Sequence, residues 1–334
     1  MNASNWLDES RDTLDLDKTR SYQSQNGFCW WANTIRTEVV SFKTAQGSQG
    51  CRISSNMWKG YAGDGQENDL INSLMRNATL SAPTRCELEP ARIRLVTAFP
   101  LDDEKSGWIS GFVSLLAAQQ NAEASRWSAL IQDWKRDVSA PFNTGLCAPS
   151  PFEQIEADLL NGIGKRASLY AGELETISEQ LHGEGVHNVK TGSSGLCAAL
   201  RIGDQTGLFR MLVRQPHARL GNGLFVMLTV PVEGDASLAL RLNQLELSVE
   251  SPVLGPGSWC AGEVGLTHIS FYPNAFYRPG IESWITDWSI KRAAWVASTL
   301  NLGSSNGLFA SSGGRNLPLY QALLETYRGE QASP

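Results

Sequence analysis

The stretch CAALRIGDQTGLFRMLVRQPHARLGNGLFVMLTVPV, residues 197–232, determines the predicted fold of the second half of the chain. It contains three short runs of aliphatic, aromatic and β-branched residues, separated by turns rich in Gly, Asp and Asn. Runs of this length and composition between such turns are typical of strands in an antiparallel sheet. We therefore predict strands over 197–202, 208–214 and 224–232.

The residues around this stretch complete a mixed unit. Asp235 is a favourable N-cap, and Leu238, Leu242 and Leu245 follow it at helical spacing, which predicts a helix over 236–247. The other predicted elements of this half are one or two helices within 152–181, strands over 258–264 and 267–271, and a long helix over 281–300. The predicted order is α-β-β-β-α-β-β-α.

The first half follows the same order. Its predicted elements are a helix over 6–16, strands over 29–35, 38–44 and 51–58, a helix over 68–78, strands over 85–89 and 92–99, and a long helix over 108–138. Short echoes link the halves: INSL at 71–74 with LNQL at 242–245, Ala98-Phe99 with Ala275-Phe276, and WISGF at 108–112 with WITDW at 284–288. We predict an α+β fold of two tandem domains, each an antiparallel sheet packed with helices, that arose by internal duplication. The alternative is two unrelated α+β domains.

Composition places the domain boundaries. Residues 139–151, SAPFNTGLCAPSP, concentrate Pro, Gly and Ser between two helical stretches and are the predicted linker. The first domain then covers 1–138 and the second 152–300. Residues 301–334 are predicted to form a Gly/Ser-rich segment followed by a C-terminal helix.

Charge and hydropathy limit the classes of function. The 334 residues contain 28 Lys and Arg and 34 Asp and Glu, a net charge of −6, without a basic stripe for phosphates, so nucleic acid is not an expected partner. No apolar run is long enough to cross a membrane, and the N-terminus lacks the pattern of a signal peptide, so we expect a cytoplasmic protein without a membrane partner. The six cysteines are widely spaced, which favours reduced, buried thiols over disulfides or a zinc site.

The repeated unit, with an L-N-x-L motif in its middle helix (242–245) and a long closing helix, resembles the type III secretion chaperone-like fold. Class I secretion chaperones and sensory-transduction-regulator-like domains of bacteria share that fold. The resemblance implies a protein that binds another polypeptide without chemistry. Its members are usually homodimers of single domains, whereas two copies here imply either a monomer that is an intrachain pseudo-dimer or a homo-oligomer.

One face of the second sheet is the predicted binding surface. Phe209 and Met211 alternate along one strand, and Phe225 and Met227 alternate along the next. We expect these four side chains to form one contiguous patch. Because Met and Phe side chains adapt to different neighbours, such a patch could bind several apolar sequences. Its cover is the chain's own helix or tail, the other domain, or a bound partner.

Candidate catalytic motifs all have simpler interpretations. The chain contains four histidines, His182, His187, His217 and His268, without the spacing of a metal site, so we predict no metal, no cofactor and no catalytic residue. The leading hypothesis is a non-catalytic protein that holds a partner polypeptide. One rival is an enzyme with a site between the domains, to which Arg52, Glu87 and His268 would contribute. Another is a structural or regulatory component that assembles with its own kind.

Overall fold

The structure is a computed structural model that describes residues 3–14, 16, 21–32, 35–45, 47–59, 85–89, 92–101, 106–130, 135–136, 162–166, 169–186, 188–217, 220–248, 251–262 and 264–302. The predicted helix over 68–78, the predicted linker over 139–151 and residues 303–334 lie outside this description.

The first half of the chain forms one antiparallel sheet with strand order β1-β2-β3-β4-β6-β5. A short strand, β7, pairs with the end of β4. The elements of this half are α1 (Ala3–Thr13), β1 (Ser21–Ser24), β2 (Gly27–Ala32), β3 (Ile35–Lys43), β4 (Gln49–Lys59), β5 (Arg85–Glu89), β6 (Arg92–Pro100), α3 (Ser106–Leu130) and β7 (Lys135–Arg136).

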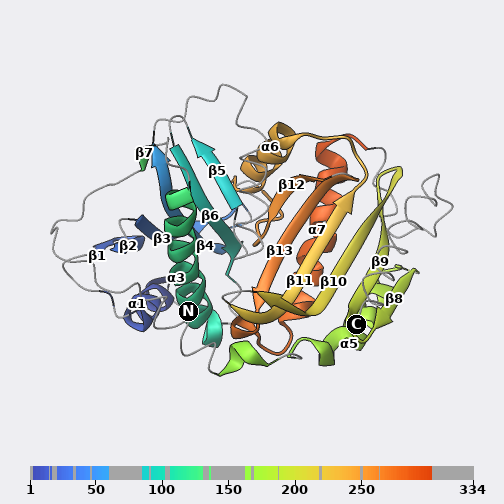
Figure 1. Ribbon diagram of the computed structural model, residues 1–334, viewed down its shortest axis with the longest axis horizontal. Helices are drawn as coiled ribbons and strands as arrows, with labels where there is room; N and C mark the ends of the chain where they lie inside the picture. Colours follow the sequence, from blue (N-terminus) through green and yellow to red (C-terminus); the bar gives the residue numbers. More distant parts are fainter. Residues whose placement is uncertain are drawn as a thin grey trace.

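The second half forms another antiparallel sheet, with strand order β8-β9-β10-β11-β13-β12 (Figure 1). Its elements are η2 (Ile163–Lys165), η3 (Ala171–Glu173), α5 (Leu174–Gly183), β8 (Val189–Gly192), β9 (Gly195–Ile202), β10 (Gln205–His217), β11 (Gly221–Val230), α6 (Ala236–Glu246), β12 (Ser258–Gly262), β13 (Gly265–Pro273), η4 (Asn274–Phe276) and α7 (Ile281–Thr299).

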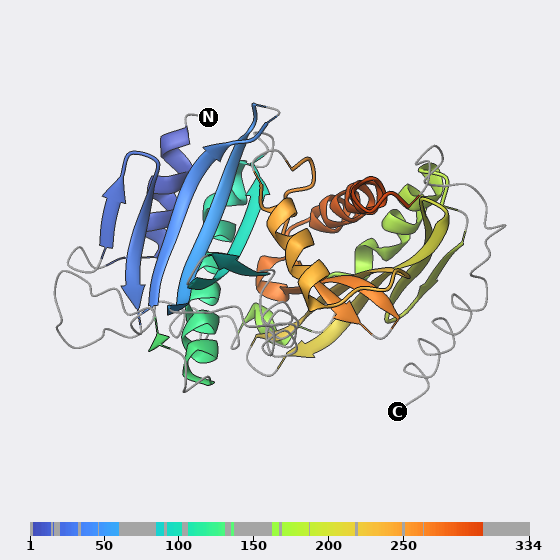
Figure 2. The same ribbon diagram turned by 90° about the horizontal axis from the view of Figure 1, so that it is seen from above.

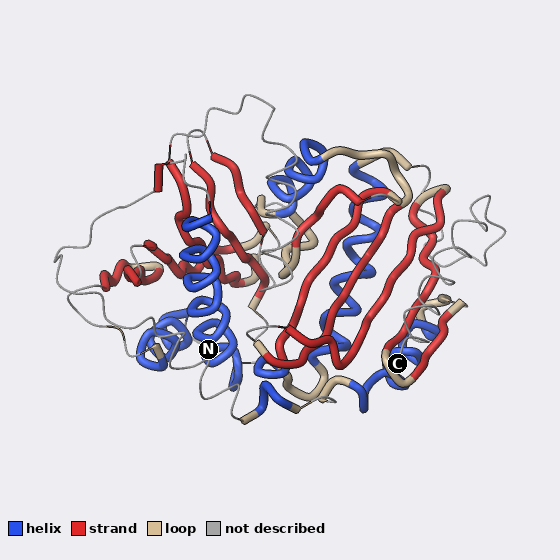
Figure 3. Tube along the Cα trace, viewed as in Figure 1, coloured by secondary structure: helices blue, strands red, loops and turns tan. Residues whose placement is uncertain are grey.

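The predicted α+β class is confirmed, because each half builds an antiparallel sheet packed with helices (Figure 3). The two sheets also have the same order when strands are matched one to one from β1 with β8 to β6 with β13. Within them, Gly50 pairs with Pro100 and Gly223 pairs with Pro273. Both positions are displaced by 173 residues, from 50 to 223 and from 100 to 273.

A second matched feature is a glycine at the start of β2 and of β9. A Cβ atom on Gly27 would lie 2.1 Å from the carbonyl oxygen of Val39, and one on Gly195 would lie 2.2 Å from that of Met211. Only glycine allows the neighbouring backbone to approach this closely.

Some sequence expectations were wrong. Two short edge strands, β1 and β8, were not predicted. The first group of consecutive strands therefore has four members in each half, β1–β4 and β8–β11, and not the three that were predicted. Lys135 and Arg136 were placed in the long helix but pair with β4, and α3 ends at Leu130. The echo of Ala98-Phe99 in Ala275-Phe276 joins unlike places, since the first pair lies within β6 and the second in η4.

Helix α3 covers one face of the first sheet through a buried polar network. The side chain of Gln120 accepts a hydrogen bond from Thr97 Oγ1 at 2.9 Å and donates to Ser55 Oγ at 3.3 Å. Asn121 Nδ2 donates to Thr37 Oγ1 at 2.7 Å. Because paired buried polar groups need precise geometry, this network fixes the position of α3 on the sheet.

The second domain packs against both faces of the first sheet near β6. On the face away from α3, Val96, Ala98 and Phe42 form an apolar cluster with Leu247 and Leu254 of the second domain. Edge strand β5 contacts α6 and β12, and Figures 1 and 2 both show α6 at the junction of the two halves.

On the other side of β6 the contact between the halves is aromatic. Phe112 of α3 meets Phe276 with ring centroids 5.1 Å apart and Trp284 with centroids 6.3 Å apart. Phe99 also contacts the Trp284 ring at 6.4 Å. Residues of the second domain therefore pack against both faces of the first sheet at β6.

A buried ion pair joins α6 to α7 near this junction. Arg292 of α7 contacts Glu246 of α6 at 2.6 Å, and both side chains are almost completely buried. The second carboxylate oxygen of Glu246 accepts a hydrogen bond from Trp259 Nε1 at 2.8 Å. Because the charges are paired and hydrogen-bonded, removal of either partner would leave a costly buried charge.

Candidate functional site

The four predicted binding residues lie on neighbouring strands but point to opposite faces of the second sheet. The register pairs Phe209 with Leu228 and Arg210 with Met227. Since directly paired residues point the same way, Phe209 shares a face with Leu228 and not with Met227. The expectation of one contiguous Phe/Met patch is therefore wrong.

Phe209 and Met211 face α7. Both are fully buried, and Thr286 of α7 donates its hydroxyl hydrogen to Met211 Sδ at 3.6 Å. These two residues belong to the core between the second sheet and α7 and are closed to a partner.

Phe225 and Met227 point away from α7 and are half-buried. Leu212 pairs directly with Phe225, and Ala199 lies on the same side of β9, two residues from the position that pairs with Arg210. These two neighbours are half-buried as well. We call the surface formed by Ala199, Leu212, Phe225 and Met227 the outer face of the second sheet.

Other residues on this side of the second sheet are buried and are not open to a partner. Leu208, Ile269 and Phe271 lie on the same side of the sheet and are buried. Cys197 is also buried, and burial raises the pKa of its thiol to about 11. A thiol that stays protonated near neutral pH is a poor nucleophile, so Cys197 serves packing in this place.

The expected burial of the cysteines is confirmed for the four whose side chains the structure describes. Cys29, Cys51, Cys197 and Cys260 are free and buried. Burial raises the pKa of the Cys29 and Cys51 thiols too.

The residues suggested for an enzyme are only partly brought together. Glu87 lies between two guanidinium groups, with Arg52 at 2.6 Å and Arg94 at 2.7 Å. His268 belongs to the other sheet, is buried at 3% exposure and packs its ring edge-on against Trp259. The first group has the geometry of an ion-pair network that joins three strands, and the histidine is part of the core.

The other described histidines are also dispersed. His182 Nδ1 lies 2.6 Å from the carbonyl oxygen of Ser178 at the end of α5, whereas His217 Nδ1 accepts a hydrogen bond from the Leu220 amide at 3.1 Å. His187 lies outside the described residues. Within the part of the chain that the structure describes, no three His, Cys, Asp or Glu side chains gather as a metal site would require.

A buried carboxyl pair was missed by the sequence reasoning. Glu282, in the first turn of α7, is fully buried, and neither of its carboxylate oxygens has a hydrogen-bond partner among the described residues. Its pKa is raised to about 9 by burial first and then by the neighbouring Glu173. Glu173 accepts hydrogen bonds from Tyr277 Oη at 2.9 Å and from the Gly280 amide at 3.2 Å. Burial and the hydrogen bond to Glu173 raise the pKa of Tyr277 to about 12.

Perturbed carboxyl groups often mark active sites. Glu282, however, has no exposed surface through which a substrate would reach it. We assign the pair to the packing of η3 against the start of α7.

Two cavities lined by described residues lie in the first domain, away from the outer face. One of about 460 Å³ opens beside the turn between β3 and β4 and is lined by Asn26, Ser41, Phe42, Lys43, Gly47 and Gln49. A smaller one, of about 50 Å³, lies between α1 and the hairpin of β1 and β2.

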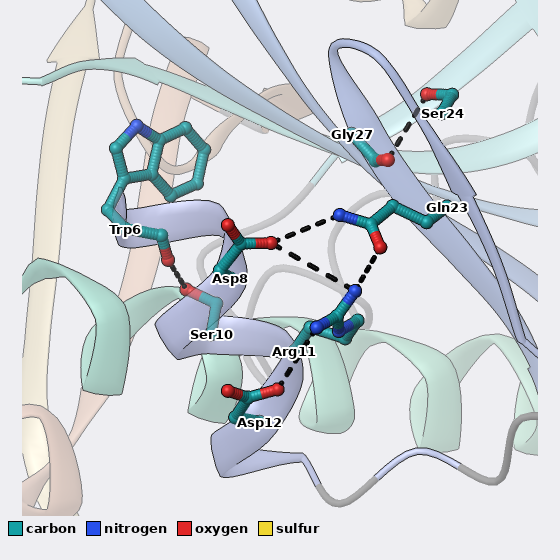
Figure 4. Close-up of polar contacts among 8 residues, drawn as sticks. All are labelled: Trp6, Asp8, Ser10, Arg11, Asp12, Gln23, Ser24 and Gly27. Atoms are coloured by element: carbon teal, nitrogen blue, oxygen red, sulfur yellow. Dashed lines mark hydrogen bonds and ion pairs between the residues drawn. The ribbon is translucent and has the colours of Figure 1, made fainter. Parts of the chain in front are cut away.

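Figure 4 shows the polar contacts beside the smaller cavity. Gln23 Nε2 donates to Asp8 at 3.1 Å, Arg11 donates to the Gln23 carbonyl oxygen, and Arg11 pairs with Asp12 at 3.3 Å. Asp12 and Gln23 are exposed, and Asp8 and Arg11 are half-buried. Pairs that remain open to solvent contribute little energy. They tie α1 to the hairpin and do not form a ligand site.

No described helix is both long and apolar enough to cross a membrane. Comparison of the sequence with protein-family models and with curated proteins found no match.

Proposed function

We propose that this protein holds an apolar segment of another polypeptide on the outer face of the second sheet and catalyses no reaction. The observation that carries the proposal is the placement of Leu212, Phe225 and Met227 side by side, half-buried and directed away from α7. Grouped apolar side chains on a sheet face favour contact with another apolar chain. Methionine adapts its shape to different partners, so a range of sequences would fit.

The chemistry of the other groups supports a binding role over catalysis. Glu87 is held between Arg52 and Arg94, and Glu282 is sealed from solvent. Neither arrangement offers a reactive group to a bound molecule.

We also infer that the two domains arose by duplication and act together as an intrachain pseudo-dimer. Support comes from the common strand order, from the matched Gly–Pro pairs and from the contact between β5 and β12, which are corresponding edge strands. The resemblance to type III secretion chaperone-like domains agrees with this arrangement and with a cytoplasmic role in keeping a partner unaggregated.

The test uses a permanently unfolded polypeptide, reduced and carboxymethylated α-lactalbumin, labelled with a fluorophore. We expect the wild-type chain to raise its fluorescence anisotropy and Met227→Asp to weaken binding at least tenfold, because a carboxylate on the outer face would lose its hydration in the complex. The Met227→Asp chain should keep its melting temperature within a few degrees, since Met227 is half-buried.

Two matched variants make the result specific. Val264→Asp places the same charge at an apolar residue that is 41% exposed in the turn after β12, and binding should be unchanged. Met211→Asp places it under α7, where the domain should unfold. Tight binding by Met227→Asp, or unfolding of that variant, would contradict the proposal.

A further inference from the structure

The second sheet carries basic side chains and no acidic ones. Its six strands contain Lys190, Arg201, Arg210 and Arg214, and none of the six contains an Asp or a Glu. The strands of the first sheet, by contrast, carry both signs, as the contacts of Glu87 with Arg52 and Arg94 illustrate. This bias occurs in a chain whose net charge is −6.

The register brings three of these cations, Lys190, Arg201 and Arg210, to the outer face. Lys190 pairs with Cys197, Cys197 with Arg210, and Arg210 with Met227, so the four residues form one row across four strands. Arg201 lies on the same side of β9, two positions from Ala199. Lys190 and Arg201 are exposed at the margin of the apolar residues.

The charges of the row act on the thiol of Cys197, which lies within it. Both Arg210 and Lys190 act to lower the pKa of Cys197, although burial outweighs them. Both cations therefore act on the thiol that lies between them in the row.

We propose that the segment held on the outer face combines apolar residues with flanking Asp or Glu residues. The inference rests on the proposed function and adds the chemistry of the partner. Apolar side chains would cover Leu212, Phe225 and Met227, while carboxylates would reach Lys190 and Arg201 at the margin. Opposite charges at the rim of an interface steer association and select among partners.

A peptide fits these features better than a nucleic acid does. Leu212, Phe225 and Met227 lie on the inner strands, β10 and β11, and Lys190 and Arg201 lie on the outer strands, β8 and β9. A polyphosphate backbone would need a continuous row of exposed cations and would gain nothing from the apolar residues between Lys190 and the opposite margin.

The experiment measures the affinity of the full chain for three labelled peptides that share the core Leu-Ser-Leu-Ser-Leu and carry two Glu, two Ser or two Lys residues at each end. We expect the Glu peptide to bind about three- to tenfold more tightly than the Ser peptide at low salt, and the Lys peptide to bind least, as two exposed charge pairs would produce. The difference should shrink in 0.5 M NaCl because salt screens exposed charges.

Charge reversal at the site should remove the preference. Lys190→Glu with Arg201→Glu should make the Glu peptide bind no better than the Ser peptide. The control, Arg241→Glu with Lys291→Glu, changes the net charge equally on α6 and α7, where both residues are exposed, and should keep the preference.

The possible failures differ from one another. Equal binding of the three peptides to the wild-type chain would overturn the acidic preference and leave the proposed function standing. Absence of binding by all three would overturn both. Displacement of the Glu peptide by an equal concentration of single-stranded oligonucleotide would show that the cations serve phosphates, and would overturn the assignment of an acidic peptide.

Discussion

Replacement of Glu282 by Gln should stabilise the protein at neutral and alkaline pH. Glu282 is fully buried, and its pKa is raised from 4.5 to about 9 by burial and by the neighbouring Glu173. The folded state therefore keeps a proton that the unfolded chain releases. Stability is fully present below pH 4.5 and is lost as the pH rises towards 9.

The size of the effect follows from this interval. Each pH unit above 4.5 costs about 1.4 kcal/mol, so the loss is about 3 kcal/mol at pH 7 and about 6 kcal/mol at pH 9. Glutamine has the same shape as the protonated acid but never ionises. Glu282→Gln should thus unfold at a higher urea concentration than the wild type at pH 7, and by a larger margin at pH 8.5.

The assay is urea unfolding followed by tryptophan fluorescence at pH 5, 7 and 8.5. Glu173→Gln should also flatten the pH dependence, although less, because burial of Glu282 would persist and only the neighbouring charge would disappear. Glu175→Gln, at an exposed position on α5, is the matched control and should follow the wild type. Parallel curves for Glu282→Gln and the wild type at all three pH values would refute the reasoning.

Two further predictions concern packing. Met211→Ala should lower the free energy of unfolding by about 2–5 kcal/mol, because it empties a fully buried site beneath Thr286; urea denaturation measures this, and a change below 1 kcal/mol would contradict the assigned burial. Leu254→Asp should loosen the two domains by setting a charge against Val96 and Ala98, seen as faster proteolysis between them, whereas Leu254→Met should behave as the wild type.

The sequence was sufficient to predict the regular elements that bury many apolar residues. β5 has exactly the predicted bounds of 85–89, and α6 and α7 end within one residue of prediction. The edge strands β1 and β8 were not predicted because each has only four residues and is mostly exposed. Neither therefore shows a hydrophobic alternation.

The site depended on information that no single strand contains. The alternation of Phe209 with Met211 and of Phe225 with Met227 was read correctly within each strand. Which of them share a face is set by the register of β10 on β11, and a shift by one residue reverses the answer. The carboxyl pair of Glu173 and Glu282 was missed for a similar reason, because its members come from segments more than a hundred residues apart.

The cluster of Phe42, Val96 and Ala98 with Leu247 and Leu254 bears on how the chain folds as it leaves the ribosome. The first sheet and α3 are complete once Arg136 of β7 has been made, but roughly 110 to 120 residues more are needed before Leu247 and Leu254 follow. At about 5–20 residues per second that interval is on the order of ten seconds. During synthesis the first domain therefore presents an uncovered apolar sheet face, and the growing chain must stay protected from aggregation until its own second half arrives.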